Sequence, residues 1–264
     1  MQWEALTAAD LQTAARTHGV CVINFAVLEK HADHLPLGTD LFIGHQIACR
    51  AAQREPAVVF PPYYFGKVYE ATCYPGAIAL EPRLLLDLAL NLFREIARNG
   101  FKKILLHNSH GGNWAFLRFL TQCNIAEACD YTLYLPETFV PPHHAEAHNA
   151  LCAIPPDEHA GAVETALMLA LLPEHVRTEK TPAEDAAPRQ RLQHLPGIFT
   201  GVSWYANYPD HYAGNAASNA TQEQGGQLVE LYTRILAERI KAVKEDRRAP
   251  ALKAHFEEQR RNPI

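Results

Sequence analysis

The sequence predicts an α/β fold of three layers, α/β/α, in which helices cover both faces of a mostly parallel central sheet. Apolar segments of strand length alternate with longer segments of helical periodicity, an order that is typical of such folds. The chain has 264 residues, of which 48% are hydrophobic and 20% charged, enough for one large core and short for two average domains. We therefore expect a single domain over residues 1–264.

The first elements follow from apolar spacing and from one glycine. Residues 1–18 carry apolar side chains at helical intervals and end at Gly19, which suits a helix end. An apolar run over residues 20–28 predicts a strand. Residues 38–53 predict the next helix and residues 57–60 a short strand.

The middle of the chain repeats this alternation. A long helix is expected over residues 81–99, closed by Gly100, and a strand over residues 103–107. The following helix ends near Cys129, before a strand at residues 131–135.

The sequence of the last part of the chain predicts two helices and a long irregular segment. The helices lie at residues 161–172 and 221–244. Residues 173–220 contain five prolines and little periodicity, so we expect a Pro-rich lid or insertion there. Since ligands of parallel sheets bind where strands end, polar clusters directly behind strands are the candidate site residues.

Charge and composition exclude several classes of function. The 24 basic and 29 acidic residues show no basic excess, which excludes a typical nucleic-acid binder. No apolar run approaches the roughly 20 residues that span a bilayer, and no secretory signal begins the chain. The six cysteines form no C-x-x-C pair. We expect a cytoplasmic protein that binds a small molecule, without a nucleic-acid or membrane partner.

A first polar cluster lies directly behind the strand at residues 20–28. It contains Glu29, His31 and, at the start of the next helix, Asp40, all of them metal-ligand types. In an extended segment Glu29 and His31 point the same way and can share a cation, and Asp40 can bridge two cations from a different element. The alternative is a solvated loop in which Thr39 or Asp40 caps the helix.

Two further clusters carry ligand types. His110 lies in H-N-S-H-G-G-N, where two glycines let the backbone approach a ligand. Here the alternative is a nucleophilic Ser109, although the pattern G-x-S-x-G is absent. His159 and Glu164 lead into an apolar helix, and Glu164 lies beside its core-facing stripe, where a carboxylate needs a cation or donor. Alternatively, Glu164 only complements the helix dipole.

These clusters strongly resemble the motifs of the creatininase (creatinine amidohydrolase) family. Residues 29–40, E-K-H-A-D-H-L-P-L-G-T-D, resemble the family's E-Q-H-G-P-H-L-P-L-G-T-D. Residues 108–113, N-S-H-G-G-N, are similar to N-G-H-G-G-N, and residues 159–169, H-A-G-A-V-E-T-A-L-M-L, to H-A-G-x-x-E-T-S-x-M-L. The order and spacing of the motifs agree over roughly residues 20–240.

The resemblance implies a layered α/β fold with two divalent metal ions per chain, either Zn, Mn or Fe. The implied ligands are Glu29, Asp40 and His110 for one ion and His31, Asp40 and Glu164 for the other, with Asp40 as the bridge. His159 matches a position expected to move protons, so His159 and Glu164 are the candidate catalytic residues. Lys30, Asp33 and His34 are candidates for supporting roles only.

The chain departs from the family pattern in two places. Gly112 stands where creatininase itself has a glutamate, so Glu164 is expected to supply that carboxylate. Val68 and Ala71 replace the serine and histidine of the family's G-x-S-x-E-H, which removes a hydroxyl and an imidazole from the expected substrate side. Creatinine itself is therefore not the expected substrate.

The leading functional hypothesis is a metal-dependent amidohydrolase. It would cleave a C–N bond, other than a peptide bond, in a linear or cyclic amide through attack of metal-bound hydroxide on the carbonyl. One alternative is hydrolysis of a C–C bond in a cyclic ketone derived from a sugar or inositol. Another is a metal-containing binding protein without turnover. The resemblance also implies a homo-oligomer, such as a hexamer.

Overall fold

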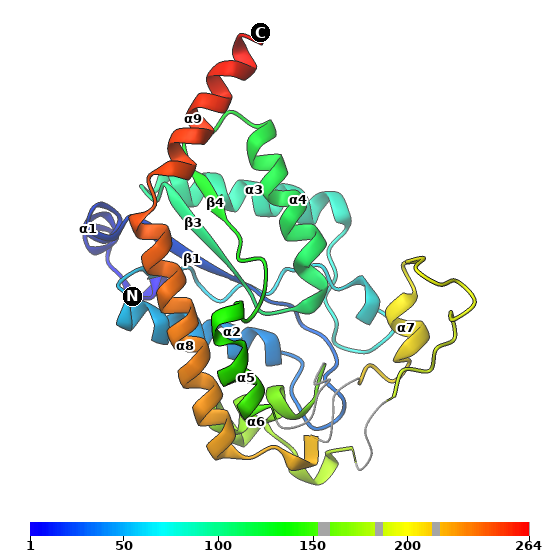
Figure 1. Cartoon of the computed structure of the whole chain (residues 1–264). Helices are drawn as coiled ribbons and strands as arrows, with labels where there is room; N and C mark the ends of the chain where they lie inside the picture. The colour runs from blue at the N-terminus through cyan, green and yellow to red at the C-terminus, as the bar shows by residue number, and fades with distance from the viewer. Residues whose placement is uncertain (153–158, 183–186, 213–216, 264) are drawn as a thin grey trace.

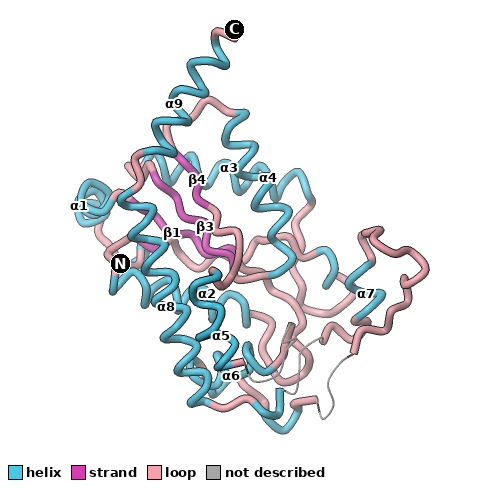
Figure 2. Tube along the Cα trace, viewed as in Figure 1, coloured by secondary structure: helices cyan, strands magenta, loops and turns pink. Residues whose placement is uncertain are grey.

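The computed structural model describes residues 1–152, 159–182, 187–212 and 217–263, and its centre is a parallel sheet. The strands are β1 (Val20–Phe25), β2 (Val58–Val59), β3 (Lys103–Asn108) and β4 (Thr132–Tyr134). Their order across the sheet is β2-β1-β3-β4, and every neighbouring pair is parallel. Figures 1 and 2 show β1, β3 and β4 side by side.

Helices pack on both faces of this sheet, which confirms the predicted α/β class. One face is covered by α2 (Thr39–Arg54), α6 (Ala162–Leu171) and α8 (Gln222–Glu245). The other face is covered by α1 (Ala8–His18), α3 (Pro82–Arg98) and α4 (Trp114–Ala126). Alternate residues of β3 enter the two cores, because successive side chains of a strand point to opposite faces.

Three α-helices have no counterpart among the elements expected from the sequence. They are α5 (Ala145–Leu151), α7 (Ser203–Asn207) and α9 (Arg248–Arg261). The first two are short, and α9 extends away from the sheet with the C-terminus at its end (Figure 1). Short 3-10 turns lie at Trp3–Ala5, Tyr69–Ala71, Gly111–Asn113, Pro142–His144, Pro173–His175, Thr178–Lys180 and Ala217–Asn219.

The helix ends expected at Gly19 and Gly100 agree with the local chemistry, whereas the helix expected to end near Cys129 ends at Ala126, and the start of the first helix and the end of the first strand are also corrected. Gly19 has φ +68° and Gly100 has φ +99°, left-handed conformations that suit glycine. The first helix begins at Ala8 instead of residue 1, because the Thr7 side chain accepts a hydrogen bond from the Asp10 amide as an N-cap. The first strand ends at Phe25, and the chain then leaves the sheet toward Glu29.

Two contacts fix α8 against the sheet and against α6. The buried Lys103 amine donates hydrogen bonds to the carbonyls of Val243, Lys244 and Asp246 at 2.8, 2.9 and 2.5 Å, which satisfies the end of the helix. At the other end of α8, a Cβ on Gly225 would lie 1.8 Å from the Ala166 carbonyl oxygen, so α6 approaches to a distance that only glycine permits. Among the described residues, none of the helices has the length and apolarity needed to cross a membrane.

Candidate metal centre

The predicted ligand residues converge at the carboxyl end of the sheet. Glu29 follows β1 and His110 follows β3, while Asp40 and Glu164 lie in the first turns of α2 and α6. Glu29, His31, Asp40 and His110 are buried, and the Glu164 side chain keeps 24% of its surface exposed. The side chains therefore come from four separate parts of the fold to one place.

The first group consists of Glu29, Asp40 and His110. His110 Nδ1 lies 2.8 Å from Glu29 Oε1 and 3.1 Å from Asp40 Oδ2, and one ligand atom of each residue lies within 4.8 Å of the others. Glu29 Oε1 and Asp40 Oδ2 are both buried, and no group among the described residues other than His110 lies in position to donate a hydrogen bond to them. Two buried carboxylates that face the same nitrogen of His110 fit a cation that all three residues would ligate, because burial of negative charge is otherwise expensive.

The second group consists of His31, Asp40 and Glu164. His31 Nε2 lies 3.2 Å from Asp40 Oδ1 and 3.7 Å from Glu164 Oε2. Asp40 thus presents Oδ1 to this group and Oδ2 to the first, an arrangement in which one carboxylate can bridge two ions. Asp40 makes no capping bond to α2, so the alternative of a helix-capping role is not supported.

In each group, the neighbouring carboxylates hold the histidine in its protonated form. Although burial acts to lower it, the neighbouring Asp40 carboxylate raises the pKa of His31 to about 9. Burial likewise opposes charge on His110, but Glu29 and Asp40 hold its pKa well above the ordinary value. Bound cations would take over the role of these protons, since metal ligands must be deprotonated.

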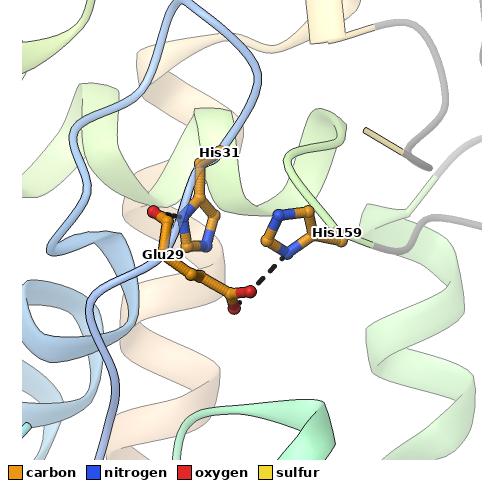
Figure 3. A group of neighbouring side chains, drawn as sticks. All are labelled: Glu29, His31 and His159. Atoms are coloured by element: carbon orange, nitrogen blue, oxygen red, sulfur yellow. Dashed lines mark hydrogen bonds and ion pairs between the residues drawn. The ribbon is translucent and has the colours of Figure 1, made fainter. Parts of the chain in front are cut away.

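His159 lies beside this centre (Figure 3). Its Nδ1 is 3.7 Å from Glu29 Oε1, its Nε2 is 2.6 Å from the Lys30 carbonyl oxygen, and its ring centroid is 4.2 Å from that of His31. Because the carbonyl can only accept, Nε2 carries the hydrogen and Nδ1 the lone pair. Burial lowers the pKa of His159 to about 3, so the ring is neutral.

His211 is a contact of the centre that the sequence did not indicate. Its Nε2 lies 2.6 Å from Glu29 Oε2, and its Nδ1 accepts a hydrogen bond from Trp204 Nε1 at 3.1 Å. This pair of bonds places the hydrogen on Nε2 and fixes the Glu29 carboxylate. His211 and Trp204 come from the Pro-rich segment 173–220, which therefore reaches the centre. No sequence motif in that segment identifies His211 as a site residue.

Glu70 occupies the space that opens at Gly112. Its Oε1 lies 3.5 Å from His110 Nε2, and its Oε2 lies 2.5 Å from Lys67 Nζ. A Cβ on Gly112 would lie 2.2 Å from Glu70 Oε1. Burial opposes charge on Glu70, but hydrogen bonds from His110 and Lys67 lower its pKa to about 2, so this carboxylate stays ionised behind His110.

The remaining candidates lie outside the ligand groups. Lys30 and Asp33 pair with each other at 3.6 Å, and Asp33 is largely exposed. His34 Nε2 donates a hydrogen bond to Thr165 Oγ1 at 2.9 Å. The Ser109 hydroxyl donates to the Phe25 carbonyl at 3.3 Å, and no histidine among the described residues lies within hydrogen-bond distance of it. The nucleophilic alternative for Ser109 therefore lacks a base.

Comparisons with known proteins identify the family of this chain. Residues 4–240 match the family model Creatininase, described as creatinine amidohydrolase. The chain is 26% identical to creatinine amidohydrolase of Pseudomonas putida, covering 84% of this chain and 90% of that one, and 28% identical to mycofactocin precursor peptide peptidase of Mycolicibacterium smegmatis, covering 66% and 65%. A solved structure titled "Creatininase Mn" superposes with a TM-score of 0.77 at 22% identity, over 93% and 99% of the two chains. The chain belongs to the creatininase family of hydrolases.

Proposed function

We propose that this chain hydrolyses the amide bond of a small molecule with the help of two divalent metal ions. The observation that carries the proposal is the shared carboxylate, because Asp40 faces His110 with one oxygen and His31 with the other. Both relatives compared above have names that denote cleavage of amide bonds. The alternative of C–C bond hydrolysis is therefore not favoured.

The donor set suits the proposed ions. Glu29, Asp40 and His110 would hold one ion, and His31, Asp40 and Glu164 the other. Such mixed carboxylate and imidazole ligands suit manganese, zinc or iron. When bound, a pair of divalent ions polarises the substrate carbonyl and lowers the pKa of an attacking water.

His159 is the proposed proton carrier. Its Nε2–H is held by the Lys30 carbonyl, so Nδ1 is the atom that faces the centre with a lone pair. A ring fixed in this tautomer can take a proton from the attacking water at Nδ1 and pass it to the leaving nitrogen, and because burial disfavours a charged ring, the proton is held only during this transfer.

Glu70 and His211 are proposed as positioning residues. Metal-binding histidines commonly donate their second ring N–H to a carboxylate, and Glu70 lies at this position behind His110. His211 similarly restrains the Glu29 carboxylate with a hydrogen bond of 2.6 Å. Neither side chain needs to contact the substrate for this role.

A pair of aspartate variants tests the proposal. Asp40→Asn should lose both ions and all hydrolysis of amides, because the bridging carboxylate contributes to both ligand groups. Asp33→Asn is the matched control, since the Asp33 side chain is 76% exposed and forms an ion pair with the peripheral Lys30. Elemental analysis should find about two ions per chain in the wild type and in the control, because each of the two ligand groups would hold one ion. Full amide hydrolysis after complete removal of metal by a chelator would refute the proposal.

The substrate is to be sought among linear and cyclic amides in that assay. The homo-oligomer, the cytoplasmic location and the lid role of residues 173–220 stay predictions.

A further inference from the structure

A large cavity of about 1420 Å³ leads away from the metal centre. It passes along the sheet face that carries α2 and α8, and its walls include residues of α4, α5 and α6. The cavity exceeds the range of about 300–1,000 Å³ that is usual for small-molecule pockets. A substrate much larger than a single five-membered ring therefore fits between the centre and the far wall.

The walls of the cavity are mainly apolar and aromatic. Ile43 and Ile47 come from α2, Ile235 and Leu236 from α8, and Trp114 from the start of α4. Apolar surface of this kind favours an apolar body in the ligand, because its burial removes both surfaces from water.

Arg239 is an isolated cation in this apolar wall. One nitrogen of its guanidinium donates to the Thr138 carbonyl oxygen at 2.7 Å. The adjacent Glu238 carboxylate lies instead against His144, at 2.8 Å. Within the part of the chain that the structure describes, no carboxylate forms an ion pair with Arg239. Burial lowers the pKa of this guanidinium, which reflects the cost of keeping it charged there.

His107 is a second group with an unused hydrogen-bonding atom in the same wall. It lies on β3, on the face toward α8, and its Nε2 is buried without a hydrogen-bond partner. Burial and, to a smaller extent, the charge of Arg239 together lower the pKa of His107 to about 3, so the ring is neutral, and both side chains line the same cavity. A buried polar atom without a partner is rare in proteins and indicates a place for a ligand or a water.

We propose that the cavity binds an amide that carries a carboxylate and an apolar body, with the carboxylate held by Arg239 and His107. The chemistry supports an anion because a planar guanidinium with several free N–H groups binds carboxylates through two parallel hydrogen bonds. Arg239 is thus a specificity-determining residue, and N-acylated amino acids with an apolar body are the substrate class. The location of the scissile bond, at the metal centre, rests on the proposed function.

A binding experiment tests this assignment without requiring turnover. The probes are 4-phenylbutyrate and 4-phenylbutyramide, which share an apolar body and differ in charge. Calorimetry on chelator-treated protein measures both affinities, so that no metal ion can capture the carboxylate. The carboxylate should bind about tenfold tighter than the amide, which corresponds to about 1.4 kcal/mol.

Matched arginine variants assign the preference to its side chain. Arg239→Gln should abolish the tenfold difference, whereas Arg239→Lys should keep part of it, because the positive charge remains. Arg234→Gln is the control, since Arg234 lies on the same helix but is exposed and outside the cavity wall. It should retain the full difference. Circular dichroism establishes that each variant is folded.

The outcomes separate this inference from the proposed function. Equal affinity for both probes in the wild type, or a preference that persists in Arg239→Gln, overturns the inference even if the enzyme hydrolyses amides. A preference that depends on Arg239 in a protein without hydrolytic activity supports the inference and refutes the proposed function instead.

Discussion

Because α6 and α8 approach closely, replacing Gly225 or Gly226 of α8 by alanine should change the stability of the protein in opposite directions. A Cβ on Gly225 would lie 1.8 Å from the Ala166 carbonyl oxygen, whereas a Cβ on Gly226 would meet nothing within 4 Å. Ordinary contact begins at 3.4 Å, so α6 and α8 must separate by about 1.6 Å to admit Gly225→Ala. The obstacle is backbone and cannot rotate away.

The expected magnitudes follow from overpacking and helix propensity. Overpacking costs typically about 1–3 kcal/mol, and we expect the upper end for Gly225→Ala because helix backbones must move. The higher helix propensity of alanine stabilises the fold by about 1 kcal/mol relative to glycine and offsets part of this cost. Gly225→Ala should therefore lower the free energy of unfolding by about 2 kcal/mol, whereas Gly226→Ala should raise it by up to about 1 kcal/mol.

Urea denaturation of chelator-treated protein measures both changes in stability. Elemental analysis adds a functional readout, because Glu164 lies two residues before Ala166 on α6 and moves with that helix. Gly225→Ala should thus bind the ion of the His31, Asp40 and Glu164 group less tightly, while Gly226→Ala keeps it. If Gly225→Ala proves as stable as Gly226→Ala, the close helix contact is wrong and so is this explanation of how Glu164 is placed.

Three more predictions concern single side chains. Gly112→Glu should lose metal in elemental analysis, because its Cβ would lie 2.2 Å from Glu70 Oε1 and 2.4 Å from His110 Nε2, and the added change Glu70→Ala should recover part of the loss. Burial lowers the pKa of His34 to about 4 from 6.5, so the unfolded state binds more protons between these values and stability falls as pH drops from about 7 to 4. In urea titrations of metal-free protein, the decrease in the free energy of unfolding over this pH range should be about 2 kcal/mol smaller in His34→Gln than in the wild type. The same pH dependence in both proteins would contradict this. Lys103→Met should lower the free energy of unfolding by about 2–3 kcal/mol in the same assay, since three carbonyls lose a charged donor; a loss under about 0.5 kcal/mol would contradict the capping role.

The sequence by itself determined the fold class and the main ligand motifs. Within the described residues, periodicity predicted the four strands and the six helices that cover the sheet, because core-facing side chains must repeat with the geometry of each element. Short polar helices such as α5 and α7 have no such stripe, so periodicity missed them. Glu29, His31 and Asp40 were recognisable because they lie within one continuous segment behind a strand.

Only the tertiary structure decided which other side chains complete the centre. His211 is 182 residues from Glu29, and no spacing rule connects positions so far apart. Gly112 looked like a missing ligand in the sequence, but in the fold it makes room for Glu70 behind His110. Arg239 resembles any helical surface arginine until α8 packs on the sheet and leaves it facing the cavity. Such roles depend on which segments the core brings together, and local sequence does not encode that choice.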